Sequence, residues 1–158
     1  MNVTIICVGK IKEKFYTEAL REYSKRISRF ASLDIIELPD ESIPQNASEK
    51  QMETIKRREG ERILSRLGQN SFTVSMCIEG KPASSEDVAA AISSAAMYPG
   101  NIVFIIGGSL GLSDEVKRRS DMRMSFGRIT LPHQLMRVVL AEQIYRGFMI
   151  NSGASYHK

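Results

Sequence analysis

The sequence is poor in the residues that build metal sites and disulfides. Its 158 residues include no tryptophan, two cysteines and two histidines, and these do not form a zinc-ligand pattern. Cys7 and Cys77 lie in apolar runs, as buried reduced thiols do. No apolar run approaches the roughly 18 residues of a membrane span, and the N-terminus lacks the basic region and cleavage site of a signal peptide. We therefore expect a cytoplasmic protein with no metal and no membrane contact.

Positive charge is concentrated in the last quarter of the chain. Residues 117–158 carry eight Lys or Arg against two carboxylates, a net charge of +6, whereas residues 1–116 carry 14 against 16, a net charge of −2. A localised positive field suits a polyanionic partner such as nucleic acid. A solvated helix face would account for the same charges, so composition alone leaves the two readings open.

Apolar runs alternate with helix-period segments five times, which favours an α/β fold with a parallel sheet flanked by helices. The predicted strands are 3–8, 33–38, 72–78, 102–106 and 125–131; the predicted helices are 15–30, 49–67, 84–97, a short one from 114, and 134–150. The charged middle of the second helix, residues 56–62, is expected to face solvent. No composition break or repeat divides the chain, so we expect residues 1–158 to form a single domain.

A glycine-rich turn, Gly107-Gly-Ser-Leu-Gly111, directly follows the apolar strand 102–106. Ligands of open α/β sheets bind beyond the carboxyl ends of the strands, so this turn marks the expected site. It is neither a Walker loop nor the GxGxxG fingerprint. Glycines that only satisfy positive φ are the alternative, and Ser113 with Asp114 is explained by a helix start.

Two further segments are candidates for function. Residues 125–137 contain Gly127 and Pro132, which imply an irregular backbone able to present amides and carbonyls to an adenine edge; an edge strand stopped by proline is the alternative. His133 suits a helix start better than a catalyst. The terminal Tyr156, His157 and Lys158 offer a stacking ring, an imidazole and a phosphate partner, all suited to RNA, although chain ends are commonly frayed.

Four motifs together resemble one family. Ile105-Ile-Gly-Gly-Ser-Leu-Gly-Leu-Ser-Asp114, Leu131-Pro-His-Gln-Leu-Met-Arg137, Glu142-Gln-Ile-Tyr-Arg146 and the terminal Tyr-His-Lys are similar to the RlmH family of the SPOUT class. These are methyltransferases of pseudouridine N3 in large-subunit ribosomal RNA. The resemblance implies a SPOUT-type α/β knot with a C-terminal trefoil knot, a homodimer, S-adenosylmethionine as methyl donor, and a pseudouridine in the helix 69 loop of 23S rRNA within assembled ribosomes as acceptor. DNA is not an expected partner.

The resemblance also assigns roles to individual residues. The implied catalytic proton acceptor is His157. Tyr156 would stack on the base, while Arg146 and Lys158 would hold phosphates. The implied cofactor pocket comprises Met76, Gly107, Phe126, Gly127, Arg128, Ile129, Thr130 and Leu131.

The sequence departs from the family pattern at two places. The tail at 151–156 lacks the Arg, Glu and Pro that relatives often have, and Gly147 stands where alanine is common.

The last helix predicts an interface, and two other functions remain to be compared. The apolar set of helix 134–150 is wider than one buried stripe needs, which predicts a two-fold interface. A non-enzymatic ribosome-associated RNA-binding protein remains the alternative function. A nucleotide-binding dehydrogenase would need a glycine fingerprint after the first strand, and residues 9–12 do not supply one.

Overall fold

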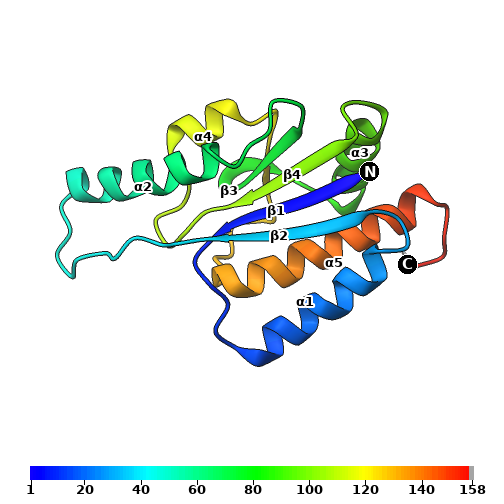
Figure 1. Ribbon diagram of the computed structural model, residues 1–158, viewed down its shortest axis with the longest axis horizontal. Helices are drawn as coiled ribbons and strands as arrows, with labels where there is room; N and C mark the ends of the chain where they lie inside the picture. The colour runs from blue at the N-terminus through cyan, green and yellow to red at the C-terminus, as the bar shows by residue number, and fades with distance from the viewer. Residues whose placement is uncertain (157–158) are drawn as a thin grey trace.

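The computed structural model describes residues 1–156 and contains one five-stranded sheet (Figure 1). Its strands are β1 (Asn2–Val8), β2 (Ser32–Leu38), β3 (Phe72–Pro82), β4 (Asn101–Ile106) and β5 (Met122–Ser125). They lie in the order β2-β1-β4-β3-β5, and every pair is parallel. The prediction of an α/β fold with a parallel sheet is confirmed.

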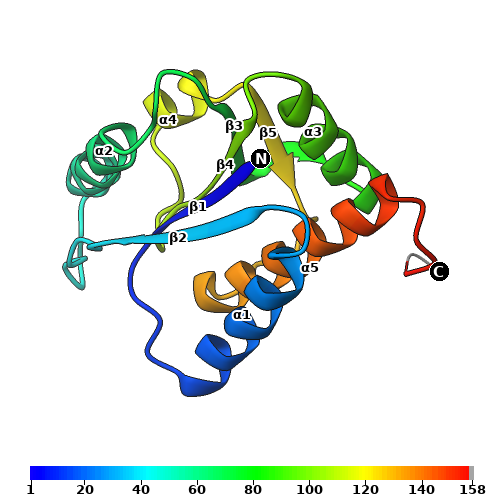
Figure 2. The same ribbon diagram turned by 45° about the vertical axis from the view of Figure 1, so that its right-hand side comes forward.

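Helices cover both faces of this sheet (Figure 2). On one face, α1 (Lys14–Ile27), α3 (Ser85–Met97) and α5 (His133–Asn151) pack around Phe104, Leu140 and Ile144, which are fully buried. On the other face, α2 (Glu49–Leu64) and α4 (Asp114–Arg119) enclose a smaller apolar cluster. Burial on both sides explains why β1 and β4 are nearly continuous apolar runs. β3 instead alternates apolar residues with the buried Thr73 and Ser75.

Three helices begin at serine caps, as predicted for Ser113. The Ser48 and Ser84 hydroxyls accept N–H bonds from Gln51 and Asp87, whose side chains bond back to the cap N–H groups. The Ser113 hydroxyl accepts the N–H of Val116. These bonds satisfy amides that would otherwise lack partners at a helix start. Among residues 1–156, no helix is both long and apolar enough to cross a membrane.

The position predicted for the fifth strand is wrong. The prediction covers residues 125–131, but β5 covers Met122–Ser125 and residues 126–132 are irregular. Met122 and Met124 face the core at the alternation of a strand, while Gly127 adopts φ 112° and ends the pairing. The apolar residues after Gly127 are therefore not core residues: Ile129 is 81% exposed.

Two burial predictions also need correction. The charged middle of α2 is predicted to face solvent, yet Glu59 and Gly60 are buried. A Cβ at Gly60 would come within 2.4 Å of the Ser113 hydroxyl, so α2 and α4 approach closely at this point. Cys7 is buried as predicted, whereas Cys77 is only partly buried.

Candidate functional site

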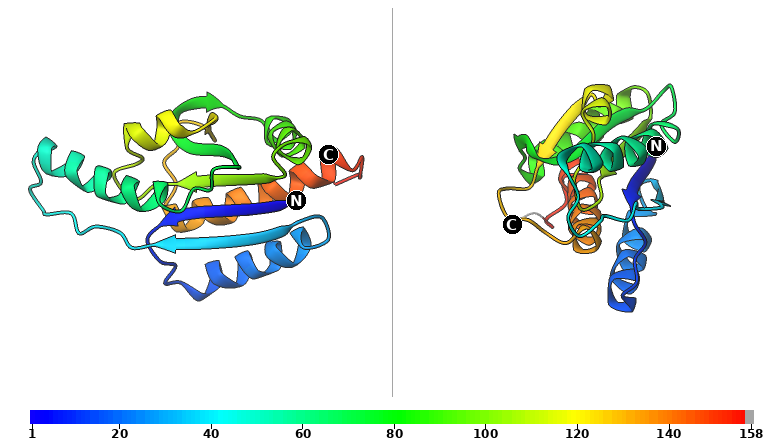
Figure 3. Two further views of the ribbon diagram at one scale, coloured as in Figure 1. Left: turned by 45° about the horizontal axis from the view of Figure 1, so that its top comes forward. Right: turned by 90° about the vertical axis from the view of Figure 1, so that its left-hand side faces the viewer.

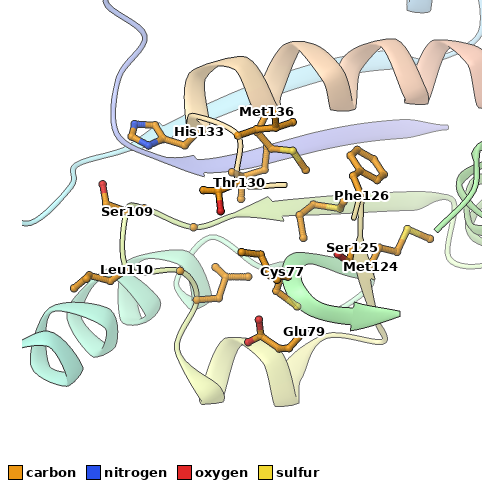
Figure 4. A pocket seen from close by; sticks show the side chains of 18 of the residues that line it. Cys77, Glu79, Ser109, Leu110, Met124, Ser125, Phe126, Thr130, His133 and Met136 are labelled. Atoms are coloured by element: carbon orange, nitrogen blue, oxygen red, sulfur yellow. The ribbon is translucent and has the colours of Figure 1, made fainter. Parts of the chain in front are cut away.

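A cavity of about 680 Å³ opens at the carboxyl ends of β3, β4 and β5 (Figure 4). Its walls come from the glycine turn after β4, the irregular segment after β5 and the first turn of α5. The floor is apolar and includes Met76, Ile106, Met124 and Phe126. Volumes of roughly 300–1,000 Å³ with a mainly apolar lining are usual for small-molecule and cofactor sites.

The resemblance names eight cofactor residues, and the cavity brings most of them together. Lining it are Met76, Gly107, Phe126, Gly127, Ile129, Thr130 and Leu131. Arg128 is not among the described residues that line the cavity; its side chain is exposed. The role of these residues in cofactor binding remains a prediction, but their convergence from three separate segments gives it a physical basis.

The first glycine of the glycine turn is required by the turn itself. A Cβ at Gly107 would lie 2.8 Å from the carbonyl carbon of Gly111 and 3.0 Å from the Leu112 side chain. The turn therefore folds back on itself where Gly107 lacks a side chain, and a bridge joins Gly108 to Gly111. Gly107 still lines the cavity, but its missing Cβ makes room for the turn and not directly for a ligand.

Opposite the glycine turn, β3 carries a bulge that sequence reasoning missed. Met76 and Lys81 both pair with Met124, so residues 77–80 loop out between them. Gly80 permits this, because a Cβ there would meet the Met124 backbone at 2.7 Å. The bulge places Cys77, Ile78 and Glu79 in the cavity wall. Its only signal in the sequence is Gly80 within a strand pattern.

An ion-pair cluster lies beside this bulge. Lys117 of α4 lies 2.7 Å from Glu79 and 3.1 Å from Asp114. Hydrogen bonding and charge attraction from Lys117 lower the pKa of both carboxyls, so they stay ionised at neutral pH. Lys117 lines the cavity, and no sequence argument singled it out.

The first turn of α5 is held in place by a buried arginine just behind it. Arg137 of α5 is fully buried and donates to the carbonyls of Val8 and Gly9 at 3.0 and 2.7 Å, and to Glu37 at 2.8 Å. His133 lies one helical turn earlier and lines the cavity (Figure 4). Partial burial, together with the charge of Arg137, lowers the pKa of His133 and keeps the imidazole neutral. A single arginine within the apolar run 135–140 was the available signal.

The predicted substrate residues that the structure describes lie elsewhere in the chain. Arg146 forms a 2.7 Å ion pair with Glu142 and stacks over the Tyr156 ring at 4.8 Å, while Tyr156 packs edge-on against Tyr145. These residues lie near the C-terminus, at the opposite end of α5 from His133 (Figure 3). The rise of the helix between Arg146 and His133 amounts to about 20 Å. His157 and Lys158 lie outside the described residues.

Comparisons with known proteins agree with the fold. A family model described as "Predicted SPOUT methyltransferase" matches residues 1–157. Ribosomal RNA large subunit methyltransferase H of Lactococcus lactis subsp. cremoris is 55% identical to this chain. The proteins of the same name from Lactobacillus delbrueckii subsp. bulgaricus and Lactiplantibacillus plantarum are 51% and 52% identical to it. Each alignment covers 100% of both chains.

One solved structure supports the fold alone. The probable methylase family protein from Haemophilus influenzae Rd KW20 aligns with a TM-score of 0.55 at 12% identity, over 99% of this chain and 70% of that one. The full-length matches carry more weight, because each alignment spans the entire chain at an overall identity of 51–55%. The chain belongs to the SPOUT methyltransferase family, within the group of ribosomal RNA large subunit methyltransferase H.

Proposed function

We propose that this protein transfers a methyl group from S-adenosylmethionine to N3 of a pseudouridine in the helix 69 loop of 23S rRNA, on assembled ribosomes in the cytoplasm. The observation that carries the proposal is the cavity between the glycine turn and residues 126–131, in a chain 55% identical to a ribosomal RNA large subunit methyltransferase H. We also infer that these two segments belong to the trefoil knot of the family.

The cavity suits the proposed cofactor in chemistry as well as in size. Met76, Met124 and Phe126 offer polarisable and aromatic surface for an adenine ring. The irregular backbones at 107–111 and 126–131 leave amides and carbonyls available for its polar edge. When bound, the sulfonium supplies an already activated methyl group. The protein then has to hold the acceptor ring in line, and alignment alone can contribute several kcal/mol.

A second copy of the chain could bring its predicted substrate residues to the cavity of the first copy. Arg146 and Tyr156 lie about 20 Å of helix away from His133, so one protomer does not bring them to its own cavity. Helix α5 supports a dimer, because Leu135, Val139 and Met149 remain only partly buried in the single chain. We infer that a homodimer brings one tail to the partner's cavity. Sedimentation at micromolar concentration should give a dimer; a monomer with full activity would contradict this.

The proton of N3 needs an acceptor, and we assign it to His157, with Lys158 and Arg146 on phosphates and Tyr156 against the base. His133 is a second candidate, because it lines the cavity and its lowered pKa keeps it neutral. The variants His157→Asn and His133→Asn separate the two. The residue that accepts the proton should, when replaced, lower kcat far more than cofactor affinity, with partial recovery at higher pH.

The decisive experiment uses ribosomes from a strain that lacks this methyl group. Purified protein with radiolabelled S-adenosylmethionine should label 23S rRNA, and mass spectrometry of nuclease fragments should place the methyl on N3 of a helix 69 pseudouridine. Calorimetry with S-adenosylmethionine tests the alternative of a non-enzymatic RNA-binding protein, which predicts no binding. Methylation of a different base, or none, would contradict the proposal.

A further inference from the structure

The structure divides the basic residues of 117–156, the described part of the last quarter, into two groups. Lys117, Arg137 and Arg146 each have a carboxylate partner at 2.7–2.8 Å. The four arginines between residues 118 and 128 do not: among residues 1–156, none of them forms an ion pair, and all four are exposed. These are Arg118, Arg119, Arg123 and Arg128, here called the arginine edge.

The arginine edge follows one border of the molecule. Arg118 and Arg119 end α4, Arg123 lies in β5, and Arg128 lies in the loop that follows it. In the sheet order β5 is outermost and pairs only with β3, so its other side has no neighbouring strand within the described chain. Met122 and Met124 point into the core shared with α3 and α5, which leaves Arg123 on the opposite face, the one that carries α4.

The arginine edge reaches the cavity. The loop that holds Arg128 contributes Gly127 and Ile129 to the cavity wall on either side of it. Arg123 is close enough to the wall to act on Cys77: burial raises the pKa of this thiol and Glu79 adds to the rise, whereas the charges of Lys117 and Arg123 oppose it. A ligand that follows the edge from α4 therefore arrives at the mouth of the proposed methyl-transfer site.

Carboxylates near the edge are already engaged. Asp114 and Glu79 bind Lys117, and Asp121 accepts the N–H and O–H of Thr73, both at 2.8 Å. Glu115 is the acidic residue of α4 for which the described residues show no ion pair. The uncompensated charge is thus positive. Arginine binds phosphates through a planar fork and stacks on bases, which makes it the side chain suited to RNA.

We propose that Arg118, Arg119, Arg123 and Arg128 bind the phosphate backbone of the RNA substrate and guide its target loop into the cavity. This proposal rests on the proposed function for the identity of the RNA, but the surface itself is defined by exposure, charge and position. It differs from the tail residues, because it holds RNA beside the cavity of its own protomer.

The test compares two double variants that remove the same charge. Arg119→Gln with Arg123→Gln alters the edge. Arg21→Gln with Arg29→Gln is the matched control, because both are exposed on or just after α1 and form no ion pair among the described residues. The probe is a fluorescent single-stranded RNA of roughly 20 nucleotides, titrated between about 50 and 200 mM salt. Removing one phosphate contact should reduce the slope of log K against log salt by about 0.7.

We expect the edge variant to bind RNA at least about tenfold more weakly, with a salt slope lower by roughly 1.4. The control should stay within about twofold. With ribosomes, KM should rise in the edge variant while affinity for S-adenosylmethionine is unchanged. Arg119→Lys with Arg123→Lys keeps the charge and should recover most of the affinity. If the edge variant unfolds, Arg118→Gln alone replaces it, with an expected slope change of about 0.7.

Equal decreases in RNA affinity for the edge and control variants would overturn the proposal, since the effect would then follow net charge and not position. Unchanged RNA binding by the edge variant would overturn it as well. Failure of the proposed function gives a different result: the unaltered protein would transfer no methyl group to ribosomes, while the RNA titration would still report on the edge.

Discussion

Replacing Arg137 by methionine should destabilise the protein by about 2–4 kcal/mol. The guanidinium is fully buried, and its hydrogen bonds to Val8, Gly9 and Glu37 join β1, β2 and α5. Breaking a buried charge pair costs roughly 3–5 kcal/mol when the remaining charge stays buried. The Glu37 side chain is 33% exposed and can regain water, which places the expected decrease in stability at the lower end of that range.

Methionine also offsets part of this cost. Arg137 is costly to bury, and its Nε has no hydrogen-bond partner among the described residues. An apolar side chain of similar length removes that desolvation penalty, as in other replacements of buried ions. The two carbonyls of Val8 and Gly9 lose a charged donor, however, and each such bond contributes about 1.5–3 kcal/mol. The net effect therefore stays unfavourable.

Urea unfolding followed by circular dichroism measures this difference, and the melting temperature should fall by about 5–15 °C for a chain of this size. Arg146→Met is the matched control: it removes an ion pair between α5 residues one turn apart, worth about 0.5 kcal/mol. A decrease below about 1 kcal/mol for Arg137→Met would refute the reasoning. The buried guanidinium would then hold the corner at Gly9 and His133 no better than methionine does.

Three further predictions address the glycine turn, the buried carboxyl of Glu59 and the C-terminal tail. Gly107→Val should lower affinity for S-adenosylmethionine at least tenfold, about 1.4 kcal/mol, because the added side chain forces the turn away from Gly111; unchanged calorimetric binding would contradict this. Burial raises the pKa of Glu59, so the folded state holds this proton more tightly than the unfolded state does. The resulting contribution to the free energy of unfolding is present at low pH and is lost as the pH rises through the folded-state pKa. Glu59→Gln should therefore gain stability relative to the unaltered protein as pH increases toward about 8, whereas Glu61→Gln, an exposed change, should not. Deleting residues 156–158 should leave melting temperature and cofactor binding nearly intact but abolish methyl transfer; a normal rate would make the tail dispensable.

Most of the fold can be predicted from the sequence because the central strands β1 and β4 are almost uninterrupted apolar runs. Burial on both faces removes the polar alternation, and serines at 48, 84 and 113 mark where helices begin. The fifth strand was predicted at the wrong position because a local sequence pattern was misleading there. Residues 128–131 alternate polar and apolar side chains as a strand does, but Gly127 turns the chain away from the sheet, and Ile129 lines the cavity instead.

The site was predicted in part, and what was missed depends on contacts between distant segments. Gly107 and the loop after β5 could be placed because glycine and proline act on the local backbone. Lys117 and Glu79 could not, because a charged side chain is expected at the surface until the fold shows what it faces. Glu59 shows the same effect: it lies in a charged run, yet it is 5% exposed and its carboxylate lies under Gly108.

The basic residues of the last quarter, residues 117–158, also differ in whether the fold buries or exposes them. Counting residues cannot separate a buried structural cation from an exposed one, although they contribute equally to a net charge of +6. Arg137 stabilises the corner of the cavity and offers nothing to a ligand, since all of its surface is buried. Arg146 is shared between Glu142 and Tyr156. Within residues 117–156, the exposed arginines that lack an ion pair lie between residues 118 and 128, next to the cavity. The field that suggested a polyanionic partner therefore acts at the edge of β5, where RNA would have to approach for a base to reach the proposed methyl donor.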